Sequence, residues 1–146
     1  WLPAGPYVVF LTATSRDDKL WPEAHWMLLG RQLQALGLAL VLPAGSPAER
    51  ERAARLAVTL PGAVAAPPLS IGELASLLAG ARVVIGVDTG LSHLAVALQT
   101  PTVAVYVATD PGLTGVVGSG FHRNLGGKAQ VPTPAAVMAA LPAVLA

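Results

Sequence analysis

The stretch "VIGVDTGLSHLAVAL", residues 84–98, decides the fold class of this chain. A continuous aliphatic run over residues 83–87 predicts a buried strand, and a tight Asp-Thr-Gly loop follows it at residues 88–90. Apolar residues then recur at the i, i+3, i+4 and i+7 spacing of one helical face, at Leu91, Leu94, Ala95 and Leu98. The order is therefore strand, loop, helix.

The Asp-Thr-Gly triplet has two interpretations. Aspartic proteases present a catalytic carboxylate on such a loop, but there the loop is followed by more strand in an all-β domain. Between a strand and a helix, the loop instead directs free backbone N–H groups and the positive end of a helix dipole to one point. The flanking sequence favours this second interpretation, an anion-binding loop.

Composition limits the class of protein. The chain has 146 residues, of which 53% are hydrophobic and 12% are charged, and this composition predicts one folded domain with a sizeable core. No apolar stretch reaches the roughly 18 residues of a membrane span, and the absence of cysteine excludes disulfides and thiolate metal sites. A net charge of +1 without a basic stripe argues against nucleic acid as a partner. The expected location is cytoplasmic.

Strands and helices are expected to alternate along the chain. The apolar runs predict strands at residues 7–11, 38–42, 63–66, 83–87 and 102–106, each followed by a helix or loop, with a glycine-rich loop at 108–120 and a last helix from Thr133. Residues 1–6 are expected to be a linker and residues 7–146 one domain. The expected fold is α/β, a Rossmann-like parallel sheet with helices on both faces.

All four aspartates follow predicted strands: Asp17, Asp18, Asp88 and Asp110. In a parallel sheet, ligands bind beyond the carboxyl ends of the strands, where the strand order reverses. The distribution of acids therefore predicts a ligand site at this edge of the sheet.

The loop after the first strand contains Thr14, Ser15 and Lys19, one of only two lysines. Two hydroxyl groups and an ammonium group suit the oxygens of a diphosphate. The alternative is a solvated loop with an Arg–Asp pair and a helix cap.

In the second loop, Thr89 and Gly90 are expected to approach an anion, and Asp88 to cap the helix and accept a sugar hydroxyl at once. His93 is either a neutral hydrogen-bond donor to phosphate or a first-turn histidine bonded to a neighbouring loop. A Ser92–His93 catalytic pair is not expected, because adjacent helical residues point about 100° apart.

Two further positions remain open from the sequence alone. Glu49 follows the second strand, where an acid can bind ribose hydroxyls, or it stabilises the first turn of a helix. Leu69 follows the third strand and either lines a pocket for a base or packs in the core. No cluster has metal-ligand spacing, so we expect neither a metal nor another cofactor.

Four segments together resemble the C-terminal half of the ADP-heptose glycosyltransferase family: "TSRDDKLWPEAHW" (14–26), "GSPAERERA" (45–53), "LAGARVVIGVDTGLSHLAVAL" (78–98) and "TDPGLTG" (109–115). The resemblance covers nearly the whole chain in order and spacing. It implies an inverting GT-B heptosyltransferase of lipopolysaccharide biosynthesis, whose C-terminal domain binds the sugar nucleotide while its N-terminal domain binds the acceptor.

The same resemblance assigns roles to residues. It implies contacts of Thr14, Ser15 and Lys19 with the diphosphate and heptose, and of Asp88 with the donor sugar. It places the phosphates on Thr89, Gly90, Leu91 and His93, the ribose on Glu49, and the adenine beside Leu69.

The resemblance implies that the catalytic base belongs to the N-terminal acceptor-binding domain, which we expect to be absent from this chain. The resemblance therefore implies no catalytic residue and no metal here, and a chain that is inactive alone. ADP-heptose and Kdo-lipid A are the implied donor and acceptor, at the cytoplasmic face of the bacterial inner membrane. The alternative is a freestanding nucleotide-binding module without catalysis.

Four positions depart from the family pattern. Residues 107–108 are Val-Ala where the family carries Gly-Pro, Leu69 stands in place of methionine, and Ser15 in place of threonine.

Overall fold

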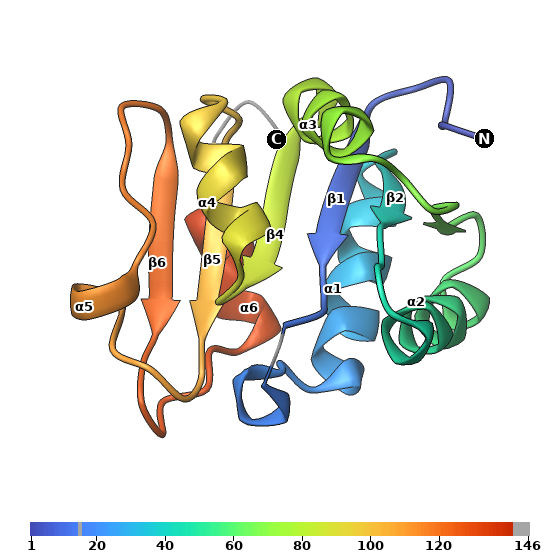
Figure 1. The fold of residues 1–146 in the computed structure, drawn as a ribbon. Helices are drawn as coiled ribbons and strands as arrows, with labels where there is room; N and C mark the ends of the chain where they lie inside the picture. The colour runs from blue at the N-terminus through green and yellow to red at the C-terminus, as the bar shows by residue number, and fades with distance from the viewer. Residues whose placement is uncertain (15, 142–146) are drawn as a thin grey trace.

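A computed structural model describes residues 1–14 and 16–141. Over these residues the chain forms one six-stranded sheet in the order β3-β2-β1-β4-β5-β6, with every strand pair parallel (Figure 1). The strands are β1 (Tyr7–Leu11), β2 (Ala39–Leu42), β3 (Val64–Ala65), β4 (Val83–Val87), β5 (Thr102–Tyr106) and β6 (His122–Gly126). The helices are α1 (Glu23–Ala35), α2 (Pro47–Thr59), α3 (Ile71–Gly80), α4 (Gly90–Ala97), α5 (Pro111–Thr114) and α6 (Pro134–Ala140), with a 3-10 turn η1 (Asp17–Lys19).

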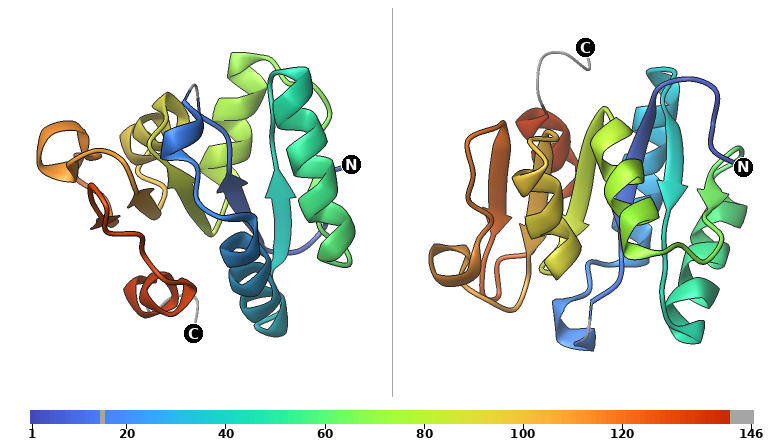
Figure 2. Two further views of the ribbon diagram at one scale, coloured as in Figure 1. Left: turned by 90° about the horizontal axis from the view of Figure 1, so that it is seen from below. Right: turned by 45° about the horizontal axis from the view of Figure 1, so that its top comes forward.

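Helices cover both faces of the sheet (Figure 2). On one face α1, α2 and α6 pack against the strands through Trp26, Leu56 and Val137. On the other face α3 and α4 pack through Leu78 and Ala95. The central strands β1, β4 and β5 are buried along their whole length, as expected for strands covered on both sides. The predicted Rossmann-like α/β fold is confirmed, and the all-β fold of an aspartic protease is excluded.

The strand order places a crevice between β1 and β4. The chain runs outward from β1 to β2 and β3, then crosses back to β4 on the other side of β1. This reversal is the point at which parallel α/β sheets bind ligands. Leu11 pairs with Gly86 in the register, so the loops that follow these two strands leave the sheet side by side.

Strand β6 was not expected, because the sequence predicts no element between the glycine-rich loop at 108–120 and the helix from Thr133. Its sequence, HRNLG, is polar and only partly buried, so it carries no apolar run that could mark it. Asn124 on this edge strand bonds both the N–H and the carbonyl of Val116, each at 3.0 Å. The preceding loop therefore shields the edge, which polar side chains and covering segments commonly do.

The helical spacing of apolar residues predicts Leu36, Ile71 and Leu98 on buried helical faces, but all three are exposed, at 49%, 71% and 37%. Leu36 and Leu98 lie one position beyond the ends of α1 and α4, and Ile71 is the first residue of α3. The expectation was wrong at these positions because helical periodicity does not identify the residue at which a helix ends.

Gly86 in β4 allows α4 to pack closely on the sheet. Ser92 is fully buried and donates from its hydroxyl to the Val87 carbonyl at 2.8 Å. A Cβ on Gly86 would collide with Ser92 Oγ and lie 3.0 Å from Leu11 Cβ. Ser92 is thus a structural residue, in agreement with the expectation that it is not a nucleophile.

We predict that Gly86→Ala lowers the free energy of unfolding by about 1–3 kcal/mol, because overpacking a dense core costs this much. Urea unfolding measures the change. Gly72→Ala is the control, since the nearest atom to its Cβ would be 3.9 Å away and the site is an exposed helical position. Equal stability of the two variants would contradict the packing role of Gly86.

Candidate functional site

A cavity of about 260 Å³ opens at the crevice between β1 and β4. Its wall contains half of the residues expected from the sequence: Thr14, Glu49, Leu69, Thr89 and Leu91. The rest of the wall is mainly apolar, formed by Leu11, Ala13, Pro43, Ala44, Gly45, Pro67 and Leu74. Thr14 and Thr89, which are 75 positions apart in the chain, therefore face one space.

The start of α4 presents free backbone donors to this space. Thr89 is the N-cap residue, in an extended conformation, and no side chain caps the helix. Among the described residues, none accepts a hydrogen bond from the N–H of Gly90 or Leu91, and a Cβ on Gly90 would meet nothing within 4 Å. Helices α2, α3, α5 and α6 do have side-chain caps, from Ser46, Ser70, Asp110 and Thr133. The uncapped start of α4 suits an anion.

Asp88 joins the loops of three adjacent strands. Its Oδ2 lies 3.1 Å from the ammonium group of Lys19 and accepts a 2.8 Å hydrogen bond from the Thr109 hydroxyl. Thr14 Oγ1 donates to the Asp88 backbone carbonyl at 2.9 Å. With 8% of its surface exposed, Asp88 is a buried anion whose charge is compensated by Lys19.

Asp88 was expected both to cap α4 and to accept a sugar hydroxyl, and the first of these expectations was wrong. The carboxylate turns toward Lys19 and Thr109, and Thr89 occupies the N-cap position instead. A charged partner outweighs a backbone N–H here, because a charge-assisted contact between two ionised groups is the stronger interaction.

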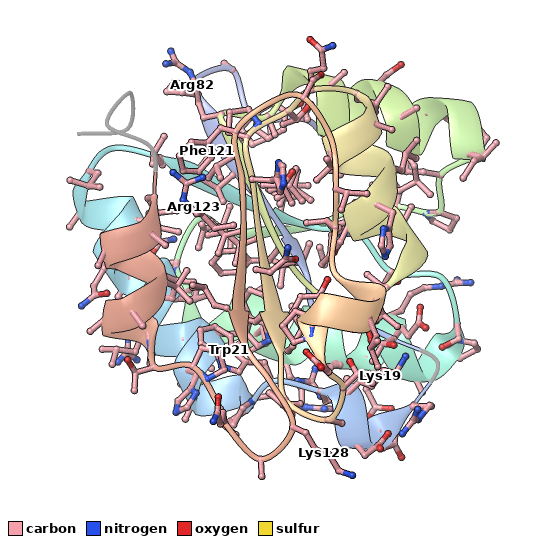
Figure 3. The ribbon with its side chains drawn as sticks, turned by 90° about the vertical axis from the view of Figure 1, so that its left-hand side faces the viewer. Lys19, Trp21, Arg82, Phe121, Arg123 and Lys128 are labelled. Carbon is pink, nitrogen blue, oxygen red and sulfur yellow. The ribbon has the colours of Figure 1, made fainter. Side chains whose placement is uncertain are left out.

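Lys19 ends the turn η1 and points into the molecule at the carboxyl edge of the sheet (Figure 3). Its side chain is 19% exposed, whereas the neighbouring Arg16–Asp18 ion pair is 54% exposed on both sides. The hydrogen bond from Arg16 lowers the pKa of Asp18 below its ordinary value. The solvated Arg–Asp pair of the alternative interpretation thus exists beside an inward-facing Lys19. Ser15 lies outside the described residues.

Glu49 has a structural role that is compatible with a binding role. Its Oε2 accepts hydrogen bonds from the N–H groups of Gly45 at 2.9 Å and Ser46 at 3.2 Å, which completes a capping box at the start of α2. None of the described residues donates to Oε1, and Glu49 lines the cavity. Leu69 is partly buried against the core, and it also lines the same cavity.

Four of the expected site residues do not line the cavity itself: Lys19, Asp88, Gly90 and His93. Asp88 and Lys19 meet beside it, whereas His93 is exposed in the first turn of α4. No hydrogen bond joins the exposed His93 ring to another described residue, so the alternative of a histidine bonded to a neighbouring loop is not found.

Thr109 is a site residue that the sequence reading missed. It belongs to the "TDP" segment directly after β5, at the same edge as the other polar loops, and that position was the available signal. Close by, burial and the charge of Asp88 raise the pKa of Tyr106 to about 12. Tyr106 therefore stays neutral near pH 7.

The described part of the chain lacks two features. No group of three His, Cys, Asp or Glu side chains is arranged to hold a metal ion. No described helix has the length and apolarity needed to cross a membrane.

Known proteins resemble this chain in sequence and in fold. The sequence model of glycosyltransferase family 9 (heptosyltransferase) matches residues 3–135. Lipopolysaccharide heptosyltransferase 1 of Escherichia coli strain K12 is 51% identical over 121 residues, which are 83% of this chain and 37% of that protein. The protein of the same name from Pseudomonas aeruginosa is 49% identical over 116 residues, covering 80% and 33%. This chain thus spans about a third of the length of these relatives.

Solved structures agree. The E. coli heptosyltransferase WaaC with ADP superposes with a TM-score of 0.84 at 45% identity, over 94% of this chain and 44% of that one. E. coli ADP-heptose lps heptosyltransferase II gives a TM-score of 0.84 at 26% identity, over 96% and 46%. With the family model, the sequence relatives and the fold in agreement, this chain belongs to glycosyltransferase family 9, the heptosyltransferases.

Proposed function

We propose that residues 7–146 are the donor-binding domain of an inverting glycosyltransferase that transfers heptose from ADP-heptose to the Kdo-lipid A inner core. The observation that carries this proposal is the shared cavity, in which Thr14 and the uncapped start of α4 face one space. The structure of WaaC with ADP, 45% identical to this chain, supports ADP as the nucleotide. Residues 1–6 would link this domain to an N-terminal acceptor-binding domain that supplies the catalytic base.

The lining of the cavity changes from apolar to polar in an order that matches the parts of a nucleoside diphosphate sugar. Its apolar side, with Leu69 and Pro67, suits the adenine, and the free Oε1 of Glu49 suits a ribose hydroxyl. The N–H groups of Gly90 and Leu91 and the hydroxyl of Thr89 suit the diphosphate as donors, and the Thr14 hydroxyl would turn from the Asp88 carbonyl to join them. Asp88 and Lys19 lie beyond these residues, where the sugar would be held.

The chemistry of this domain would be electrostatic. As the glycosidic bond breaks, negative charge grows on the departing diphosphate. The oriented N–H groups at the start of α4 and the ammonium group of Lys19 would stabilise that charge without a metal. His93, exposed in the first turn, would add a donor for a phosphate oxygen once the donor is bound. The reaction would take place at the cytoplasmic face of the bacterial inner membrane, where the acceptor is made.

We predict that Lys19→Ala in the full-length protein lowers kcat/KM for ADP-heptose about 10- to 100-fold, since a hydrogen bond from a charged group contributes about 1.5–3 kcal/mol. Steady-state transfer to Kdo-lipid A, together with calorimetric titration of ADP, measures the loss. Lys128→Ala removes the other lysine, which is exposed at the same edge of the sheet, and should leave both quantities unchanged (Figure 3).

An unmodified protein that binds ADP but never transfers heptose would favour a freestanding nucleotide-binding module. If it bound no ADP at all, the donor-binding proposal would be wrong. Equal kinetics for the two lysine variants would remove Lys19 from the mechanism while leaving the site in place.

We predict that Glu49→Gln separates the structural role of Glu49 from ribose binding. A glutamine can complete the capping box, so the free energy of unfolding should change by less than about 0.5 kcal/mol. Loss of the charged acceptor should weaken the contact with the ribose. Calorimetry should show that the advantage of ADP over 2′,3′-dideoxy-ADP is several-fold smaller in the variant than in the unmodified protein. An undiminished advantage would show that Glu49 does not contact the ribose.

A further inference from the structure

The two donors on the Asp88 carboxylate converge on one of its oxygens. The Thr109 hydroxyl and the Lys19 ammonium group both contact Oδ2, at 2.8 and 3.1 Å. No described residue donates to Oδ1. A carboxylate has about four lone-pair sites over two oxygens, so this arrangement occupies one oxygen and leaves the other available.

We propose that Thr109 is a positioning residue for the donor sugar, acting through Asp88. Its hydroxyl holds Oδ2 so that Oδ1 is the oxygen presented to the sugar. This inference rests on the proposed function, because it assumes that Asp88 receives the sugar of the donor. It adds to the proposed donor site a residue that follows β5. The other members of this cluster follow β1 and β4.

The segment that carries Thr109 is held in place independently of Asp88. The next residue, Asp110, accepts a 2.8 Å hydrogen bond from the Gly112 N–H, and Pro111 begins α5. Gly115 closes that short helix through a 2.8 Å bond to the Pro111 carbonyl. Thr109 lies between this closed turn and the end of β5. Its backbone is therefore held in place, and its hydroxyl reaches Asp88 from a fixed position.

Thr109 has a role that Lys19 cannot fill while a donor is bound. The diphosphate offers the ammonium group of Lys19 a second anion, and the ammonium group is attached to a flexible four-carbon side chain. The Thr109 hydroxyl is neutral, its side chain is short, and the diphosphate does not compete for it as strongly. When Lys19 turns to the diphosphate, Thr109 therefore remains to fix the carboxylate.

The test compares Thr109→Val, which removes the hydroxyl and keeps the shape, with Thr109→Ser, which keeps the hydroxyl. Both are made in the full-length protein and assayed for heptose transfer from ADP-heptose. We expect kcat/KM to fall at least tenfold in Thr109→Val and to stay within threefold in Thr109→Ser. ADP affinity by calorimetry should stay within threefold in both, because ADP carries no sugar for Asp88 to hold. Thr114→Val, which changes an exposed threonine of the same segment, is the matched control and should leave all values unchanged.

Two results would overturn the proposal: unchanged kcat/KM in Thr109→Val, or equal losses in the valine and serine variants. A parallel loss of ADP affinity would likewise overturn it, since Thr109 would then support the whole loop and not Asp88. Should Thr109→Val fail to fold, Thr109→Ala removes the hydroxyl without adding bulk.

A ligand-free crystal structure of each variant gives a readout that does not depend on the proposed function. The carboxylate of Asp88 should turn away from its present position in Thr109→Val and keep it in Thr109→Ser. An unmoved carboxylate in Thr109→Val would refute the positioning role even if the unmodified protein bound no ADP. Absence of ADP binding by the unmodified protein would instead refute the donor site alone.

Discussion

Parallel pairing of β1 with β4 is the constraint on which the site depends. The register, with Leu11 opposite Gly86, ends both strands at one edge and makes their following loops neighbours. Backbone hydrogen bonds set this register, and burial of both faces keeps it from slipping, because a slip of one residue would exchange the side chains of the two faces. Thr14 consequently reaches the Asp88 carbonyl, and Lys19 reaches its carboxylate. The Lys19–Asp88 ion pair and the cavity therefore both depend on the pairing of these strands.

Within that framework, α2, α3, α5 and α6 are capped by side chains at their first turns, whereas α1 and α4 are not, and of these two only α4 begins at the cavity. Ser46 with Glu49, and Ser70 with Glu73, satisfy the first N–H groups of α2 and α3 through capping boxes. At α4 no side chain caps the helix: Thr89, the N-cap residue, makes no capping bond, Asp88 turns to Lys19, and Ser92 bonds the Val87 carbonyl. The free donors of α4 therefore face the cavity, and they would be satisfied by an anion.

Some charged groups at the site serve both the stability of the fold and the proposed binding. Asp88 could not remain an isolated anion in so enclosed a position, and Lys19 compensates its charge. The same pair keeps an ammonium group beside the cavity. Structural need and proposed chemistry thus use one interaction, as they do at Glu49, where one oxygen caps α2 and the other is open to the cavity.

The sequence by itself determined the fold class, the edge of the sheet that carries the site, and five of the twelve residues of the cavity wall. Strands β1, β4 and β5 match the predicted apolar runs residue for residue, because strands buried on both faces are hydrophobic throughout. It could not reveal β6, whose polar residues lie at an exposed edge, nor the helix ends at which Leu36 and Leu98 become exposed. Only the tertiary structure decided that Asp88 turns from α4 to Lys19 and Thr109, since these partners are 69 and 21 positions away in the chain. Local pattern records which side chains are available. Which partner each one takes depends on distances that exist only after the strands have paired.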